Sequence, residues 1–186
     1  MTEIESGRRE QVLESALVTF ARFGFRKTSM EDVAQAANIS RPGLYFLFSS
    51  KQSLFQAAVV HALDADVDAA ERALADVRRP LRERLIEAFD LWTGRYLGPM
   101  VQEVAVLRET SPELLGPLVA GYPARFAAMV TEAIAAEVPP GLVEAVARTL
   151  ISTSGGIKHE VSTREEFVER VTVAVDLLLR AGRAAG

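Results

Sequence analysis

The sequence predicts an all-α protein, with an N-terminal three-helix head joined by a long helix to a helical C-terminal domain. Apolar residues recur at the three-to-four-residue spacing of amphipathic helices along most of the 186 residues. Capping residues, Pro and Gly mark where such stretches begin and end, and no useful length alternates with the two-residue period of a strand. With 49% hydrophobic residues the chain can bury a substantial core. We expect two domains, residues 1–50 and residues 51–186.

The first two helices are predicted by an apolar stripe and a capping pattern. Residues 28–31, Thr-Ser-Met-Glu, match a capping box in which Thr28 is the cap and Glu31 its partner. This box predicts a short second helix over residues 30–37. The stripe predicts a first helix that ends at Gly24, and its members are Leu13, Ala16, Leu17, Phe20 and Phe23.

A tight turn and a third helix follow directly. Asn38 tolerates the left-handed conformation that ends a helix, and Ile39 can anchor the turn to the core. Ser40 can cap the third helix, with Pro42 in its first turn, where backbone N–H groups lack partners in any case. Two short helices joined in this way, behind a scaffold helix, have the dimensions of a helix-turn-helix.

Longer helices are predicted for the rest of the chain. A fourth helix begins at Lys51 and runs to about residue 77, and residues 111–117 form a Pro- and Gly-rich connector. A capping box at residues 163–166 opens the last helix. The remaining predicted helices cover residues 80–96, 98–110, 123–137, 142–159 and 164–182.

The third helix has two chemically different faces. Leu44 and Phe48 are four residues apart, so they share a face that can pack inward. Arg41 and Tyr45 are also four residues apart and lie on a different face. An arginine can donate two hydrogen bonds to a guanine edge, and a tyrosine hydroxyl can reach a phosphate oxygen. This second face therefore has the chemistry of a DNA-reading surface.

The charges of the chain favour the same region as a site for phosphate. The net charge is −4, yet the stretch from Arg22 to Lys51 holds five Lys/Arg against two Asp/Glu. Lys51 adds its charge to the positive end of the fourth helix's dipole, and Gly43 lets a DNA backbone or base approach closely. Double-stranded DNA is therefore the predicted partner of this segment.

Residues 23–55, FGFRKTSMEDVAQAANISRPGLYFLFSSKQSLF, resemble the DNA-binding region of the TetR (tetracycline-repressor) family of bacterial regulators. The resemblance covers about residues 8–60, and its most specific part is Leu-Tyr-x-x-Phe-x-x-Lys at residues 44–51. It implies a homodimer whose C-terminal domain binds a small molecule and dimerises through its last two long helices. By position it implies that Thr28, Tyr45 and Lys51 contact phosphate and that Ser40, Arg41 and Pro42 face the groove. The predicted DNA interface also includes Ser29 and Gly43.

Two positions depart from the family pattern. Position 43 is often threonine in the family and position 47 is often a histidine that contacts phosphate, whereas this chain has Gly43 and Leu47. Both departures remove polar contacts. They keep open an alternative in which a helical ligand-binding or interaction dimer carries a head that no longer binds DNA.

Large apolar and aromatic residues on the middle helices predict a pocket for a mostly apolar or aromatic effector. Trp92 and Tyr96 lie one turn apart and carry polar tips that suit a pocket wall, although each member of the set also fits an ordinary core. The predicted pocket residues are Phe89, Trp92, Tyr96, Met100, Val104, Leu107, Phe126 and Met129.

The last two helices carry apolar stripes with no later element to cover them. Such stripes predict a four-helix seam between two copies, although part of each stripe must also cover its own subunit. The predicted seam residues are Val146, Leu150, Ile157, Phe167, Val171, Val175 and Leu178.

Other function classes lack support in the sequence. The absence of Cys excludes disulfides and fits a reducing cytoplasm, and we expect no membrane partner because no signal peptide or membrane span is visible. The spacings of nucleotide-binding loops, hydrolase elbows and zinc proteases are absent, so we expect no catalytic residue and no cofactor. His61, Asp64 and Asp68 share a face that fits a solvated surface better than a metal site.

These observations, together with what the resemblance implies, predict a ligand-responsive dimeric transcriptional regulator. We expect a repressor that binds a pseudo-palindromic operator as a homodimer and is released by a small apolar or aromatic effector.

Overall fold

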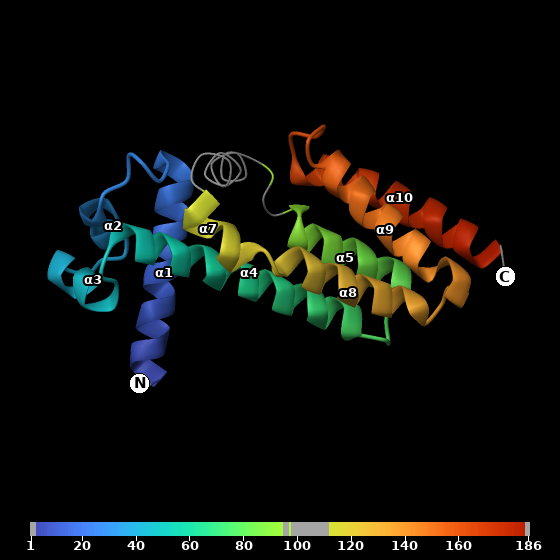
Figure 1. The fold of residues 1–186 in the computed structure, drawn as a ribbon, viewed down its shortest axis with the longest axis horizontal. Coiled ribbons are helices and arrows are strands. Elements are labelled where there is room, and N and C mark those ends of the chain that lie inside the picture. The colour runs from blue at the N-terminus through green and yellow to red at the C-terminus, as the bar shows by residue number, and fades with distance from the viewer. Residues whose placement is uncertain (1–2, 95–96, 98–111, 185–186) are drawn as a thin grey trace. The chain divides into compact units, whose positions relative to one another are not determined.

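The described part of the chain consists of helices joined by turns, without a strand (Figure 1). The structure, a computed structural model, describes residues 3–94, 97 and 112–184. The all-α prediction is confirmed for these residues, while the helix predicted over residues 98–110 lies outside them. The helices are α1 (Glu3–Phe23), α2 (Met30–Ala36), α3 (Arg41–Leu47), α4 (Lys51–Ala75), α5 (Leu81–Trp92), α7 (Pro112–Val119), α8 (Tyr122–Ala135), α9 (Pro140–Ile157) and α10 (Arg164–Ala184).

The chain divides into two compact units, which we call the head and the body. The head is Met1–Asp64 with Pro99–Val119, and the body is Ala65–Gly98 with Ala120–Gly186. The sequence placed the boundary after residue 50, whereas these units divide α4 after Asp64. The reason is packing, because the first turns of α4 bury a group of apolar side chains in the head core, namely Leu54, Phe55, Ala58 and Val59.

The head core is formed by α1, α2, α3 and the first half of α4, which Figure 1 shows grouped together. Three phenylalanine rings, Phe20, Phe25 and Phe55, pack with centroids 4.8–5.8 Å apart. Leu115 of α7 is fully buried in the same core, so the segment predicted as a connector is a helix with an apolar anchor. Phe23 departs from the predicted stripe, because it lies at the end of α1, half exposed, with the Arg22 guanidinium 5.0 Å from its ring.

The body core lies between the second half of α4 and the helices α5, α8, α9 and α10. Figure 1 shows α9 and α10 running side by side as a pair. Two ion pairs join α5 to α10: Arg164 binds both carboxylate oxygens of Asp90 at 2.7 Å, and Arg82 binds both oxygens of Asp176. The hydrogen bonds from Arg82 hold the pKa of Asp176 below its ordinary value.

The capping box of α2 is displaced by one residue from the predicted one. Ser29 is the cap: its Oγ accepts from the backbone N–H of Asp32 at 3.2 Å, and Asp32 Oδ2 accepts from the backbone N–H of Ser29 at 2.8 Å. The hydroxyl of Thr28 donates instead to the carbonyl of Gly24 at 2.8 Å. Thr28 is therefore a buried structural residue, and Glu31 is not the partner in the box. The second predicted box is confirmed, because Thr163 and Glu166 exchange the expected hydrogen bonds.

Asp32→Asn tests the corrected box, with Glu31→Gln as the matched control. The hydrogen bonds from Ser29 lower the pKa of Asp32, so its charged form favours the folded head above the ordinary carboxyl pKa. That stabilisation is lost as the pH falls through the lowered pKa. We therefore expect Asp32→Asn to lower the melting temperature at pH 7, measured by circular dichroism, and the difference from wild type to shrink on acidification. A larger loss for Glu31→Gln would contradict the assignment.

Candidate nucleic-acid interface

The turn between α2 and α3 adopts the predicted geometry. Asn38 has a positive φ of 52°, and the N–H groups of Asn38 and Ile39 donate to the carbonyls of Gln35 and Ala34. This pair of hydrogen bonds is the Schellman motif, which closes α2. Ser40 then caps α3, its Oγ accepting from the N–H of Gly43 at 3.1 Å. Both helix ends at the turn are thus hydrogen-bonded, and the direction of α3 relative to α2 is fixed.

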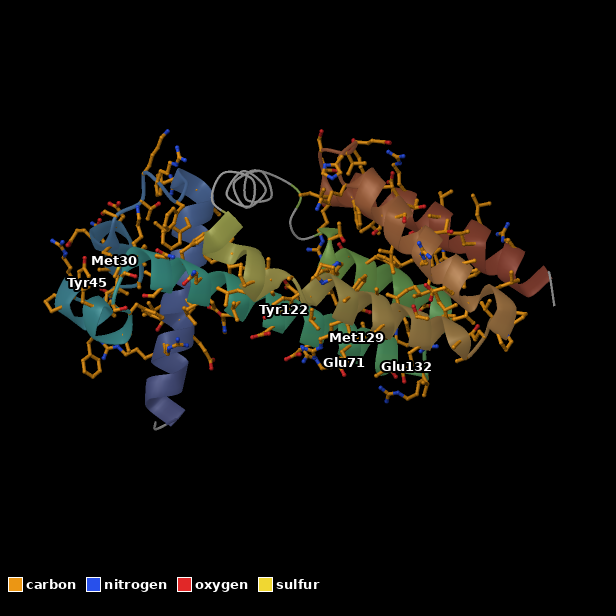
Figure 2. All side chains as sticks on the ribbon, in the orientation of Figure 1. Met30, Tyr45, Glu71, Tyr122, Met129 and Glu132 are labelled. Carbon is orange, nitrogen blue, oxygen red and sulfur yellow. The ribbon has the colours of Figure 1, made fainter. Side chains whose placement is uncertain are left out.

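One face of α3 is buried and the opposite face is exposed. Leu44 is 0% exposed and Phe48, at the C-cap, is 5% exposed, so the predicted inward pair is confirmed. Burying side chains of this size contributes about 1.5–3 kcal/mol each. Figure 2 shows Tyr45 on the same element. The exposed side chains form what we call the outer face of α3: Arg41, Pro42, Tyr45 and Phe46.

Arg41 and Tyr45 lie beside each other on this outer face. The Arg41 guanidinium is 5.7 Å from the centroid of the Tyr45 ring. Arg41 Nε is 3.9 Å from Glu31 Oε2 of α2, and both side chains are largely exposed. Exposed pairs of this kind contribute about 0–1 kcal/mol. The guanidinium can therefore exchange Glu31 for another acceptor at little cost.

Phe46 is a residue that the sequence reasoning missed. Its side chain is 88% exposed, although it is large, apolar and in the middle of α3. The signal was available, because Phe46 follows the inward Leu44 by two residues and so lies about 200° around the helix from it. An exposed phenylalanine on the same helix surface as Arg41 and Tyr45 suits an apolar contact with a partner.

The two departures from the family pattern have packing reasons. The N–H of Gly43 donates to Ser40 Oγ, and a Cβ at this position would lie 3.1 Å from that oxygen. A side chain here would therefore press on the cap of α3. Leu47 is partly buried and packs against the head core. Both positions are half-buried and lie outside the four exposed residues of the outer face of α3.

The remaining predicted DNA contacts are engaged within the head. Thr28 is 2% exposed, and the Ser29 hydroxyl takes part in the cap of α2. The Lys51 ammonium donates to the backbone carbonyls of Phe25 and Thr28, each at 2.9 Å. The exposed positive charge of this region therefore comes from other basic side chains, namely Arg22, Arg26, Lys27 and Arg41.

Four of the eight predicted pocket residues are described, and they lie in or against the body core. Phe89 and Phe126 are buried, with rings edge to face at 5.3 Å. Trp92 stacks on Phe126 at 5.1 Å, and Met129, labelled on α8 in Figure 2, is partly buried. The other four, Tyr96, Met100, Val104 and Leu107, lie outside the described residues.

The predicted seam residues belong to the interior of a single chain. Six of them are buried against their own subunit, and Leu178 is partly buried and packs on the same core. They therefore have little or no surface to offer a second copy, because the same helix faces cover α5 and α8. The six buried side chains are Val146, Leu150, Ile157, Phe167, Val171 and Val175.

The described residues offer no cluster of three or more His, Cys, Asp or Glu side chains that could hold a metal ion. His61, Asp64 and Asp68 accordingly form no such group. Among the described helices, each is too short or too polar to cross a membrane.

The N-terminal part of the chain is similar to bacterial transcriptional regulators. Residues 12–58 match the family described as bacterial regulatory proteins, tetR family. The chain is 37% identical over 59 residues to the HTH-type transcriptional regulator RutR of Escherichia coli K12, covering 32% of this chain and 28% of RutR. It is 29% identical over 56 residues to IcaR, the negative regulator of the biofilm operon icaADBC in Staphylococcus aureus Newman, covering 30% of each. The chain thus matches less than a third of the length of these relatives.

Solved structures extend the similarity to the fold of the whole chain. PfmR, a TetR-family transcriptional regulator from Thermus thermophilus, is 25% identical with a TM-score of 0.64, covering 91% of this chain and 97% of PfmR. A candidate transcriptional regulator from Saccharomonospora viridis, solved in complex with choline, is 17% identical with a TM-score of 0.74, covering 92% and 96%. The helical body as well as the head therefore has counterparts among these proteins.

Proposed function

We propose that this chain, which belongs to the tetR family of bacterial regulatory proteins, is a cytoplasmic repressor that binds a specific DNA sequence through the outer face of α3. The observation that carries the proposal is the division of α3 into a buried face and an exposed face with Arg41, Tyr45 and Phe46. IcaR, to which the head is similar, is a negative transcriptional regulator, and this supports repression as the sign of the regulation.

The three exposed side chains have complementary roles in this proposal. Arg41 donates two hydrogen bonds to the O6 and N7 of a guanine in the major groove. The Tyr45 hydroxyl binds a phosphate oxygen, which sets the register of α3 along the groove. Phe46 makes an apolar contact with the methyl group of a thymine. Arg41 and Phe46 then specify bases, and Tyr45 contributes to affinity without reading sequence.

A homodimer is supported by the outward surface of α9 and α10. Because α9 and α10 pack on α8 and α5, the faces turned away from that layer are exposed. On α10 this face carries Val173 and Leu177, which are 57% and 61% exposed. On α9 it carries small side chains that permit close helix approach, namely Ala145, Thr149, Ser152 and Gly156. We place the seam on these residues, and a two-fold dimer then requires an operator with two related half-sites.

A small-molecule effector is supported by the aromatic cluster of the body. Phe89, Trp92 and Phe126 offer apolar surface, and the Trp92 ring is only partly buried. α4 contributes to both units, with Lys51–Asp64 in the head and Ala65–Ala75 in the body. An effector bound beside this cluster would act on the head through that continuous helix.

In-vitro selection from a random duplex library tests the DNA-binding proposal. Wild-type protein should enrich a pseudo-palindrome whose half-sites lie one helical turn, or a multiple of it, apart. Arg41→Ala should lose the preference for one guanine per half-site, at a cost of about 1–3 kcal/mol. Phe46→Ala should lose the preference for one thymine instead.

Arg78→Ala is the control for the selection, because Arg78 is an exposed arginine in the body. It should return the wild-type sequence. If wild-type protein enriches no palindrome at low salt, the head does not read DNA and the alternative of a ligand-binding dimer holds.

Two glutamate substitutions on α10 test the relocated seam. Leu177→Glu should give folded monomers by light scattering, because it places a charge at the interface while leaving the body core intact. Val175→Glu should unfold the body, because an unpaired charge buried inside a subunit costs several kcal/mol. Val77→Glu, at an exposed valine that belongs to neither α9 nor α10, should leave the dimer unchanged. A folded dimer in the Leu177→Glu variant would contradict the seam.

Trp92 is the chain's single tryptophan, so its fluorescence reports on the aromatic cluster. Apolar and aromatic compounds that bind there should change this fluorescence and raise the melting temperature. A coupling of about 1–3 kcal/mol would lower operator affinity roughly 5- to 150-fold, and the operator should weaken the compound by the same factor. A compound that stabilises the protein yet leaves operator affinity unchanged would contradict the coupling.

A further inference from the structure

Lys51, the first residue of α4, holds the segment that precedes α2. Its Nζ donates to the carbonyl oxygens of Phe25 and Thr28, both at 2.9 Å, and makes a longer hydrogen bond of 3.4 Å to that of Arg26. The same Nζ lies 4.7 Å from the centroid of the Phe25 ring. An ammonium group has three protons, so each of them has a carbonyl acceptor within the head.

Because of where these carbonyls lie, the Lys51 contact affects the start of α2. They lie between the end of α1 and the cap of α2, whose own hydrogen-bond ladder begins at the carbonyl of Ser29 with the N–H of Val33. The group that fixes residues 25–28 therefore fixes where α2 begins. The Schellman turn at Asn38 then carries that position on to α3.

We propose that Lys51 is a positioning residue, which aligns α2 and α3 with α4 through these three carbonyls and does not serve as a phosphate contact. The inference rests on the proposed DNA binding, because it concerns how the head presents the outer face of α3. A phosphate could recruit this ammonium only by displacing charge-assisted hydrogen bonds, which are the stronger kind. The displaced carbonyls would then lose a donor.

The DNA test compares Lys51→Met and Lys51→Arg with wild type in the full-length protein. Each is titrated with the selected duplex and with a scrambled duplex between 50 and 200 mM salt. We expect Lys51→Met to weaken the selected duplex about 5- to 30-fold, with the scrambled duplex bound as before and the salt dependence unchanged. Lys51→Arg should stay impaired, because a planar guanidinium cannot direct its N–H groups to three carbonyls around one point.

A phosphate contact would give the opposite pattern. Both duplexes would weaken alike, the salt slope would fall by about one unit, and Lys51→Arg would retain affinity. That result would overturn the positioning role. Unchanged affinity in Lys51→Met at a temperature where it is folded would also overturn it.

A second measurement tests the contact without DNA. Amide hydrogen exchange of the free protein should be faster in Lys51→Met at Thr28 and Val33, and unchanged in α9. Lys27→Met is the matched control, because it removes the same charge from an exposed position in the same segment. Its exchange should equal that of wild type. Equal exchange in Lys51→Met and wild type would overturn the positioning role. Faster exchange in Lys51→Met would support the positioning contact. If the wild-type protein also selected no DNA sequence, only the DNA-binding proposal would be overturned.

Discussion

The burial of Leu44 and Phe48 in the head core is the constraint on which the interface depends. Both side chains leave solvent only if α3 packs against α1, α2 and α4 with one particular face inward. On a helix of 3.6 residues per turn, that choice turns Arg41, Tyr45 and Phe46 outward. The same apolar contacts that stabilise the head thus determine which side chains of α3 are exposed to a partner such as DNA.

Backbone hydrogen bonding then fixes the helix that carries those groups. Ser29 and Asp32 cap the start of α2, the turn at Asn38 closes its end, and Ser40 caps α3. Lys51 supplies donors to the carbonyls that precede α2. Polar side chains around the turn therefore form hydrogen bonds with the backbone. An unpaired buried carbonyl or N–H group costs more free energy than an exposed polar contact contributes.

Local patterns in the sequence predicted the head well, because capping, turn geometry and face assignment depend on neighbouring residues. They misplaced the cap at Thr28, because Thr28 and Ser29 are adjacent hydroxyl residues that can both cap a helix. In the folded head, the Thr28 hydroxyl donates to the carbonyl of Gly24 instead. A dimer interface is harder to predict from sequence, because a buried stripe such as that containing Val175 has the same pattern whether it covers its own subunit or a partner. Leu177 lies outside that stripe, and only the folded body shows that this large apolar side chain is exposed.

Methylation protection with dimethyl sulfate shows whether the outer face of α3 contacts base edges in the major groove. The reagent modifies the N7 of guanine, which lies in the major groove, and the N3 of adenine, which lies in the minor groove. Bound wild-type protein should protect a guanine N7 in each half-site, and Arg41→Ala should lose that protection while still binding at lower salt. Protection confined to adenine N3, or guanine protection that persists in Arg41→Ala, would contradict that contact.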